Sequence, residues 1–196
     1  MKKSNNYLVW IDLEMTGLDY NNDVILEIAT IITDNDLNII AHGPDLVIKQ
    51  PDEILNAMNT WCIEQHGKTG LTQKVKDSTV TMQQAEEETL QFLETYCEKG
   101  SAPLCGNTVW FDKIFLKKEM PLIVDFLHYR VVDVTAFKIM LSRWAGKTIE
   151  FKKINAHRAL DDIKESIEEL KFYRTHFITI PQNFSPDSSV STPDQS

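Results

Sequence analysis

Two carboxylate residues follow an apolar run near the start of the chain. In YLVWIDLEMTGLD, residues 7–19, Asp12 and Glu14 are separated by one residue. Residues two apart in a strand point to the same face of a sheet. Two such acids beside a core are costly unless something compensates their charge, and a hard divalent cation with oxygen ligands does so. The alternative is that both acids cap the turn and face solvent, which is the better interpretation of an isolated D-x-E.

A third acid has unusually apolar neighbours. Asp112 lies in GNTVWFDKIFLKK, where aromatic residues flank it on both sides. Such a setting suits a half-buried functional carboxylate. Taken alone, it suits equally well a surface acid that pairs with Lys113 or Lys117.

The segment AHRALDDI offers a fourth acid and a histidine. Helical periodicity centres the apolar stripe of this segment near Ile163 and Ile167. Asp162 then falls at the edge of the stripe and Asp161 nearly opposite it, so Asp162 is the candidate for a half-buried site. His157, five residues before Asp162, is expected at or before the start of the helix.

These residues must be positioned by a sheet and by helices. Strands are predicted at 7–12 and 23–34, with a meander through LNIIAHG and DLVIKQ, and again at APLCGN and YRVVDV. A short helix followed by a loop is predicted over 51–71, where Gly67 and Gly70 interrupt the pattern. The remaining helices are predicted in TMQQAEEETLQFLETYCEKG, in VWFDKIFLKKEM up to Pro121, in TAFKIMLSRWAG and in HRALDDIKESIEELKFYRTHF. This order predicts an α/β fold with a mixed sheet flanked by helices.

Two apolar stripes are predicted on the last two helices. The first comprises Val134, Phe137, Leu141 and Trp144, and the second Leu160, Ile163, Ile167, Leu170 and Arg174. After Ile180 the chain becomes rich in Ser, Pro and Asp. Residues 1–180 are therefore predicted to form one domain and residues 181–196 a disordered tail.

The bulk composition excludes several classes of protein. The chain has 196 residues and a formal net charge of −9, which argues against a protein that tracks along long nucleic acid. It shows neither a long apolar span nor a signal segment, and its three cysteines lack a CxxC spacing. A cytoplasmic protein with reduced thiols is expected.

Considered together, D-x-E, Asp112 and H-x4-D resemble the DEDDh family of 3′→5′ exonucleases, and most closely its oligoribonuclease branch, which degrades very short RNA. The motifs EIATIITD, LCGN, HYR followed by DVT, and ALDDIKES extend the resemblance over roughly residues 7–180. The resemblance implies a ribonuclease H-like mixed β-sheet flanked by α-helices. It also implies two divalent cations, Mg²⁺ or Mn²⁺. Their ligands would be Asp12, Glu14, Asp112 and Asp162, with His157 as the general base.

The same resemblance implies how the substrate is held. Leu18 would wedge between bases, Trp61 would stack on one, and His66 would approach a phosphate; ordinary packing or loop structure is the alternative for each. A pocket for the terminal 5′-phosphate would comprise Thr108 together with Tyr129, Arg130 and Thr135 from the partner subunit of a homodimer. Tyr129 thus belongs with both the catalytic and the binding residues. The family usually has Ser at position 108 and more polar residues in place of Trp110 and Phe111.

The leading hypothesis is a metal-dependent 3′→5′ exoribonuclease that hydrolyses short oligoribonucleotides, down to dinucleotides, to nucleoside 5′-monophosphates. One alternative is a DEDDh exonuclease with longer or DNA substrates, such as a tRNA-end trimmer, although the chain has no Lys/Arg cluster for it. Another is an inactive nucleic-acid-binding module of the same fold. An acidic interaction protein without a site would not explain why the acids recur in apolar settings.

Overall fold

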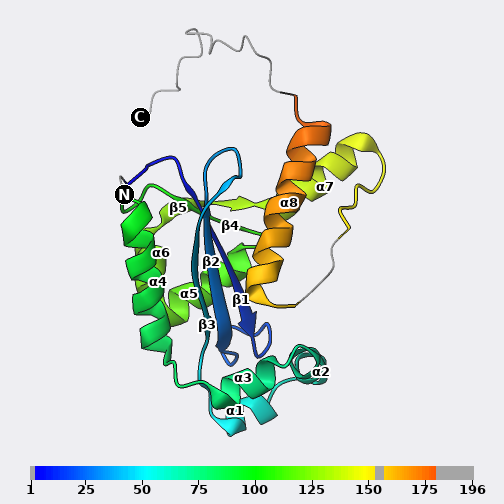
Figure 1. Cartoon of the computed structure of the whole chain (residues 1–196). Coiled ribbons are helices and arrows are strands. Elements are labelled where there is room, and N and C mark those ends of the chain that lie inside the picture. The colour runs from blue at the N-terminus through cyan, green and yellow to red at the C-terminus, as the bar shows by residue number, and fades with distance from the viewer. Residues whose placement is uncertain (1–2, 153–156, 180–196) are drawn as a thin grey trace, which may run out of the picture.

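A five-stranded mixed sheet forms the centre of the computed structural model, which describes residues 3–152 and 157–179 (Figure 1). The strands are β1 Leu8–Met15, β2 Ile25–Thr33, β3 Ile39–Val47, β4 Pro103–Gly106 and β5 His128–Asp133. Their order is β3-β2-β1-β4-β5. The pairs β1–β2 and β2–β3 are antiparallel, and β1–β4 and β4–β5 are parallel. The predicted mixed sheet is confirmed; the proposed tail, 181–196, lies outside the described residues.

Helices cover both faces of the sheet (Figure 1). They are α1 Asp52–Asn56, α2 Thr60–Lys68, α3 Leu71–Asp77, α4 Met82–Tyr96, α5 Trp110–Glu119, α6 Pro121–Phe126, α7 Val134–Ala145 and α8 Ala159–Phe177. Helices α4, α5 and α6 share one apolar core with the sheet, and α7 and α8 share a second core on the other face. The short helices α1–α3 lie beyond one end of β1 and β2, over a small cluster of their own. No helix in the described ranges is long and apolar enough to cross a bilayer.

The alternation of side chains along β1 decides which face carries the acids. Val9, Ile11 and Leu13 point into the core shared with α4–α6, whereas Trp10 points into the core shared with α8. Since alternate residues share a face, Asp12 and Glu14 follow Trp10 toward α8. β1 is thus a central strand whose face toward α4–α6 is apolar throughout. Its face toward α8 is apolar at Trp10 and acidic at Asp12 and Glu14.

Three predicted elements differ from the structure. The segment 51–71 is not a short helix and a loop, because Gly67 lies inside α2 and Gly70 takes a left-handed φ of 74° at the N-cap of α3. Pro121 does not only end α5; it occupies the first turn of α6, a position that needs no N–H. The predicted meander is one strand, β3, which tolerates Pro44 because it lies at the edge of the sheet.

The predicted apolar stripes are correct in part. On α8, Ile163, Ile167 and Leu170 are buried, but Arg174 is exposed and Tyr173 is buried in its place. A spacing of seven residues drifts by about 20° per heptad around a straight helix, so the last stripe position turns outward. On α7 the stripe is only half covered, since Trp144 remains 74% exposed.

Candidate active site

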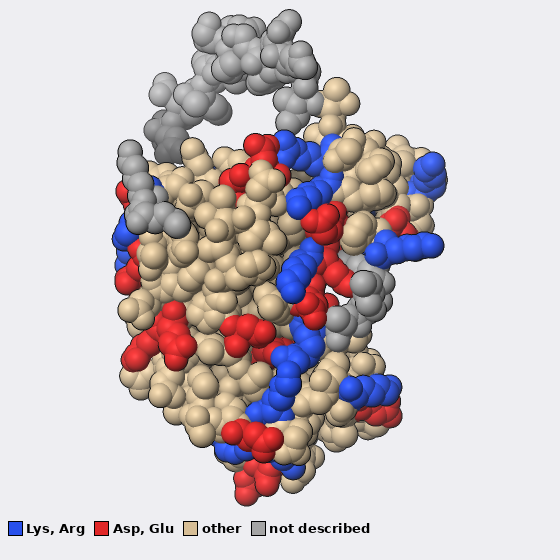
Figure 2. Space-filling model, in the orientation of Figure 1, with Lys and Arg blue, Asp and Glu red and all other residues tan. Residues whose placement is uncertain are grey.

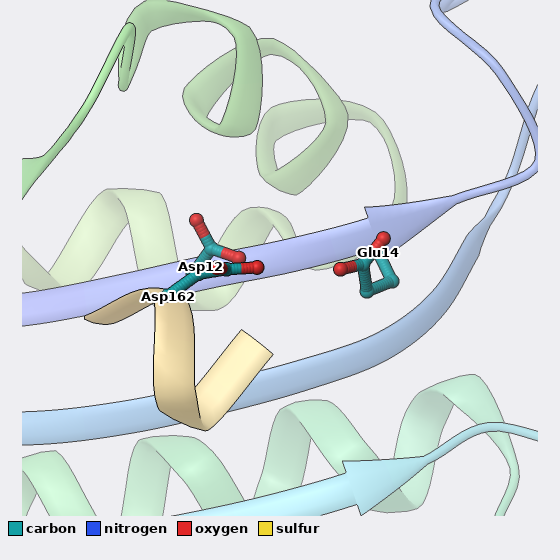
Figure 3. Close-up of side chains that lie close together, drawn as sticks. All are labelled: Asp12, Glu14 and Asp162. Atoms are coloured by element: carbon teal, nitrogen blue, oxygen red, sulfur yellow. The ribbon is translucent and has the colours of Figure 1, made fainter. Parts of the chain in front are cut away.

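Three of the predicted metal ligands come together between β1 and α8 (Figure 3). Carboxylate oxygens of Asp12, Glu14 and Asp162 all lie within 4.8 Å of one another, and the three residues are half-buried. Asp161 is exposed and its Oδ1 accepts a hydrogen bond of 3.0 Å from Lys164 Nζ. The predicted orientation of the adjacent acids on α8 is therefore confirmed.

Asp112 approaches β1 from its β4 side. The pairing of β1 with β4 covers Val9 and Trp10, which leaves the backbone N–H of Leu13 available for a side chain. This N–H donates to Oδ1 of Asp112 at 3.2 Å, and Asp112 is only 7% exposed. The group of acids within 4.8 Å, as found among the described residues, does not include Asp112. Its carboxylate is instead bonded to the residue between Asp12 and Glu14.

Burial raises the pKa of two of these carboxylates, Glu14 and Asp112. The pKa of Glu14 is raised to about 8, first by burial and then by the charges of Asp162 and Glu27, while Arg158 opposes the rise. Burial likewise raises the pKa of Asp112 to about 7, against hydrogen bonds from backbone N–H groups. When these two carboxylates are ionised, their negative charge therefore requires a nearby positive charge. An all-oxygen donor set of this density fits a hard divalent cation.

His66 completes the wall of the site beside Glu14. The residue is 1% exposed, Nε2 lies 2.9 Å from the carbonyl oxygen of Met15, and Nδ1 lies 3.9 Å from Oε2 of Glu14. Because a carbonyl oxygen only accepts, Nε2 carries the proton. Burial lowers the pKa of His66, so the ring is neutral near pH 7. These contacts differ from the predicted contact with a phosphate, for which the ring offers no exposed nitrogen in this conformation.

Both side chains that were predicted to contact bases are exposed. Trp61 on α2 is 58% exposed, and its ring centroid is 6.0 Å from that of His157 in an edge-on arrangement. Leu18 is 66% exposed on the loop after β1. Asp23 fixes this loop, because it accepts from Thr16 Oγ1 at 2.7 Å and from the N–H of Asp19 at 2.8 Å.

His157 immediately precedes α8 in an uncommon backbone conformation. Its φ is 50°, in the left-handed region that non-glycine residues rarely adopt, and its side chain is half-buried. In this conformation the imidazole lies edge-on to the ring of Trp61. The predicted role of His157 as general base stays a prediction.

Two residues of the predicted phosphate pocket, Thr108 and Thr135, are hydrogen-bonded to each other. Thr108 also has a left-handed φ, 53°, and its N–H donates to Oδ1 of Asp133 and to Oγ1 of Thr135, each at 3.0 Å. The two hydroxyls are 3.1 Å apart. Thr135 Oγ1 lies 3.1 Å from Oδ1 of Asn107, whose Nδ2 donates to Ser166 on α8 at 2.8 Å. Hydrogen bonds thus connect the two threonines to the helix that carries Asp162.

This geometry corrects one assignment. Thr135 was expected from a partner subunit, but the Thr135 hydroxyl in contact with Thr108 belongs to the same chain, because α7 begins directly beside the loop after β4. Tyr129 and Arg130 are exposed on β5, Tyr129 by 71%, and the Arg130 guanidinium lies 5.1 Å from the centroid of the Tyr129 ring. Their predicted contribution to another subunit stays a prediction.

Sequence reasoning missed two residues next to the cluster, Glu27 and Arg158. Glu27 is fully buried on β2 and accepts hydrogen bonds from Arg158. A signal was present, since Glu27 is a charged residue inside the otherwise apolar stretch ILEIATII.

Comparisons with known proteins agree with this geometry. The sequence profile of the RNase_T exonuclease family matches residues 9–170. An oligoribonuclease from Haemophilus ducreyi is 54% identical over 180 residues, which cover 91% of this chain and 98% of that protein. The mitochondrial oligoribonuclease of Mus musculus is 56% identical over 171 residues, which cover 86% of this chain and 72% of that protein.

Solved structures share the fold. Exonuclease I from Methylocaldum szegediense superposes with a TM-score of 0.68 at 15% identity, over 88% of this chain and 41% of that one. A zinc-bound complex of E. coli exonuclease I with single-stranded DNA gives a TM-score of 0.66 at 16% identity, over 89% of this chain and 41% of that one. The chain thus spans about two fifths of these exonuclease I chains, and at this identity the likeness shows the fold alone.

The sheet topology, the acid cluster and the similar proteins all indicate an exonuclease. The exonuclease I complex named above contains zinc, and in this chain the three clustered carboxylates provide a donor set that suits a divalent cation. The profile match covers most of the chain, and the relatives share more than half of its aligned residues. The chain belongs to the oligoribonuclease family of 3′→5′ exonucleases.

Proposed function

We propose that this protein hydrolyses short oligoribonucleotides, down to dinucleotides, from their 3′ ends to nucleoside 5′-monophosphates. The observation that carries the proposal is the convergence of Asp12, Glu14 and Asp162. Leu18, on the loop that follows β1, and Trp61, on the helix that carries His66, are exposed. Carboxylates provide the charge for phosphodiester chemistry, and the apolar side chains provide contact surface for bases.

Asp12, Glu14 and Asp162, with Asp112 from the β4 side, would hold two divalent cations, Mg²⁺ or Mn²⁺. When bound, such ions stabilise the attacking and leaving oxygens of an in-line displacement. The raised pKa values of Glu14 and Asp112 mean that these residues give up protons as they become ligands. His157, next to the bound nucleotide, would accept the proton of the attacking water on an imidazole nitrogen.

The substrate is held at its bases and at its 5′ end. Trp61 and Leu18 would contact bases without regard to sequence, because every base has a π-face. The paired hydroxyls of Thr108 and Thr135, with Arg130 supplying a forked cation, would bind a terminal 5′-phosphate. Such a pocket leaves no room for a further nucleotide and so favours the shortest substrates.

The surface charge supports a short substrate. Figure 2 shows basic and acidic side chains alternating along α8 rather than separating into patches. Lys164 pairs with Asp161 and Lys171 with Glu168 on this helix. Basic side chains neutralised in this way cannot follow the backbone of a long nucleic acid.

A homodimer with a composite active site would account for an exposed apolar surface on α7. An open apolar groove there is lined by Ala136, Phe137, Met140, Leu141, Trp144 and Ile178. Tyr129 and Arg130 border a second groove, on β5 and α5. Exposed apolar areas of this kind mark association surfaces. The cytoplasmic location expected from the composition stays a prediction.

A time course on two 5′-phosphorylated RNAs, a dinucleotide and a seven-mer, tests the activity and the substrate length together. With Mn²⁺ we expect faster cleavage of the dinucleotide, and with EDTA no cleavage. Equal or faster cleavage of the seven-mer would leave an exonuclease with longer substrates. No cleavage of either RNA would favour an inactive binding module.

Mixed dimers test the composite site. Tyr129→Ala and Asp162→Ala homodimers should both be inactive, for different reasons. A mixed dimer of the two variants should regain activity, because one site then combines an intact acid cluster with the partner's intact tyrosine. Absence of any recovery in the mixed dimer would show that Tyr129 acts within its own subunit.

A further inference from the structure

We propose that Glu27 and Arg158 form a positioning pair, which fixes the start of α8 on the sheet and thereby sets where His157 and Asp162 stand relative to Glu14. This inference rests on the proposed function, because it concerns how the same site is assembled. Neither residue is assigned a contact with substrate or with a reacting atom.

The pair has the geometry of a clamp. Nε of Arg158 lies 3.0 Å from each carboxylate oxygen of Glu27, and Nη2 also donates to Oε1. The backbone N–H of Ala159 donates to Oε2 at 3.2 Å. Glu27 is 0% exposed, and in the β1–β2 register it is the direct cross-strand partner of Glu14. The carboxylate that holds α8 therefore stands beside a member of the acid cluster.

Glu27 also replaces a missing helix cap. Arg158 occupies the N-cap position of α8 and, among the described residues, makes no side-chain capping bond of its own. The first N–H groups of a helix lack intrahelical acceptors and favour a nearby negative charge. Glu27 meets this need from the neighbouring strand, so the cap links α8 to the sheet instead of to its own preceding loop.

Arg158 transmits this link to the acid on α8. Its carbonyl oxygen accepts the N–H groups of Asp161 and Asp162, each at 2.9 Å. One residue thus bonds to Glu27 through its side chain and to Asp162 through its backbone. His157 is adjacent to Arg158 in the chain. The contact of Arg158 with Glu27 therefore restrains the positions of both His157, the proposed general base, and Asp162, the proposed metal ligand.

An ion pair between a fully buried carboxylate and a partly buried arginine is hard to explain by stability alone. Apolar residues of similar size in place of a buried pair are often as stabilising or more so, and farther along α8 Ile163 and Ile167 already pack on the sheet. A forked arginine–carboxylate contact, however, is directional in a way that apolar packing is not. A displacement of about 1 Å can cost a catalytic site on the order of 10²-fold in rate. The pair therefore provides orientation where the site needs it.

Two substitutions separate positioning from a simple effect of charge. Glu27→Gln removes a negative charge near Glu14, whereas Arg158→Met removes a positive one, so their effects on the acids are opposite in sign. Loss of a clamp, in contrast, acts in the same direction in both variants. Arg174→Gln is the matched control, because Arg174 also lies on α8 and pairs with Asp36 at 2.7 Å, but at the far, exposed end of the helix.

The experiment measures kcat and KM on the 5′-phosphorylated dinucleotide with Mn²⁺, and the rise in melting temperature that Mn²⁺ causes. In Glu27→Gln and in Arg158→Met we expect kcat to fall about 10- to 100-fold, as for residues that orient metal ligands. KM should stay within about twofold, and the Mn²⁺-induced rise should shrink in both variants. The double variant should lose little more than either single one, because the two residues act as a unit.

Arg158→Lys provides a test if a larger change prevents folding. Lysine keeps the charge but lacks the fork, so a clamp predicts a clear loss of kcat with an unchanged melting temperature in EDTA. Full activity of Arg158→Lys, opposite effects of Glu27→Gln and Arg158→Met, or losses no greater than in Arg174→Gln would each overturn the proposal. If the wild-type protein cleaves neither RNA, the proposed function fails, while the Mn²⁺-induced shift still tests the clamp.

Discussion

Two regions of the molecule depart in opposite directions from the usual division into an apolar inside and a polar outside. Between β1 and α8 the protein buries acids, and there the pKa of Glu14 rises to about 8. On α7 and β5 it exposes apolar side chains, with Trp144 74% and Tyr129 71% accessible. Each arrangement is costly in an isolated chain. Under the proposed function each cost has a source of compensation outside the folded chain: cations for the carboxylates, and an apolar partner surface for α7 and β5.

The two regions differ in how accurately the compensating group must be placed. Carboxylates require a charge at a defined place, because Coulomb energies inside a protein depend steeply on distance and surroundings. Apolar surface requires only that water be removed, since the hydrophobic effect is roughly proportional to area and has no direction. The effect of a substitution in the acid cluster on activity should therefore depend strongly on which position is changed. The effect of a substitution on α7 on association should depend on the size and polarity of the new side chain.

The largest effect is expected at the acid cluster. Asp162→Ala should lower turnover of the dinucleotide on the order of 10³-fold, because it removes several kcal/mol of stabilisation of charge in the transition state. Asp161→Ala, the adjacent exposed control, should retain activity within about twofold. Comparable losses in both variants, measured by steady-state kinetics, would contradict the orientation of α8 described above.

The next largest effect is expected on the apolar surface. Trp144→Glu should weaken a homodimer, since a large aromatic side chain contributes about 2 kcal/mol or more when it is buried. A twofold interface loses this contribution twice, which raises the dissociation constant about 10³-fold. Sedimentation equilibrium measures the shift. Leu122→Glu is the control, because Leu122 is 50% exposed on α6, on the other side of the sheet. An unchanged dissociation constant in Trp144→Glu would exclude this part of α7 from the interface.

The acid cluster should also make metal-free stability depend on pH. The folded pKa of Glu14, about 8, and of Asp112, about 7, lie above the usual values, so the native state binds more protons than the unfolded state from about pH 5 to 8. The free energy of unfolding in EDTA should therefore decrease by several kcal/mol as pH rises through this window, since each unit of pKa shift corresponds to about 1.4 kcal/mol.

Urea unfolding at pH 5, 6.5 and 8 measures this slope. Glu14→Gln should reduce it, and the difference between the two proteins isolates the contribution of Glu14 from that of His66, whose lowered pKa acts in the opposite sense. Equal slopes in the wild-type protein and in Glu14→Gln would show that the burial of this carboxylate does not govern stability.

The smallest effect is expected at the exposed ring of Trp61, which lies against His157. Trp61→Ala should raise KM about tenfold for a dinucleotide, since stacking on an aromatic ring contributes roughly 1–3 kcal/mol per base. Ile63→Ala on the same helix is the control, because Ile63 is also partly exposed, by 46%. A KM change as large in Ile63→Ala as in Trp61→Ala would argue against stacking on this ring.

Several elements could be predicted because they depend on local geometry. Alternation along β1 placed Asp12 and Glu14 on one face, and helical periodicity separated Asp162 from Asp161. Errors arose where a local signal had two meanings. Pro121 ends one helix and begins the next, and Gly70 caps α3 where a loop was expected. Arg174 was assigned to the buried stripe because a strict heptad was extended too far along a straight helix.

The sequence by itself determined which residue types are available and which of them share a face of one element, because strand and helix repeats are properties of the backbone. Only the tertiary structure decided which distant residues meet: Asp112 at the N–H of Leu13, Thr135 at Thr108 of its own chain, and Glu27 at Arg158. These contacts span 99, 27 and 131 positions. No repeat of the backbone encodes such separations, which follow from how the sheet and helices pack around their two cores.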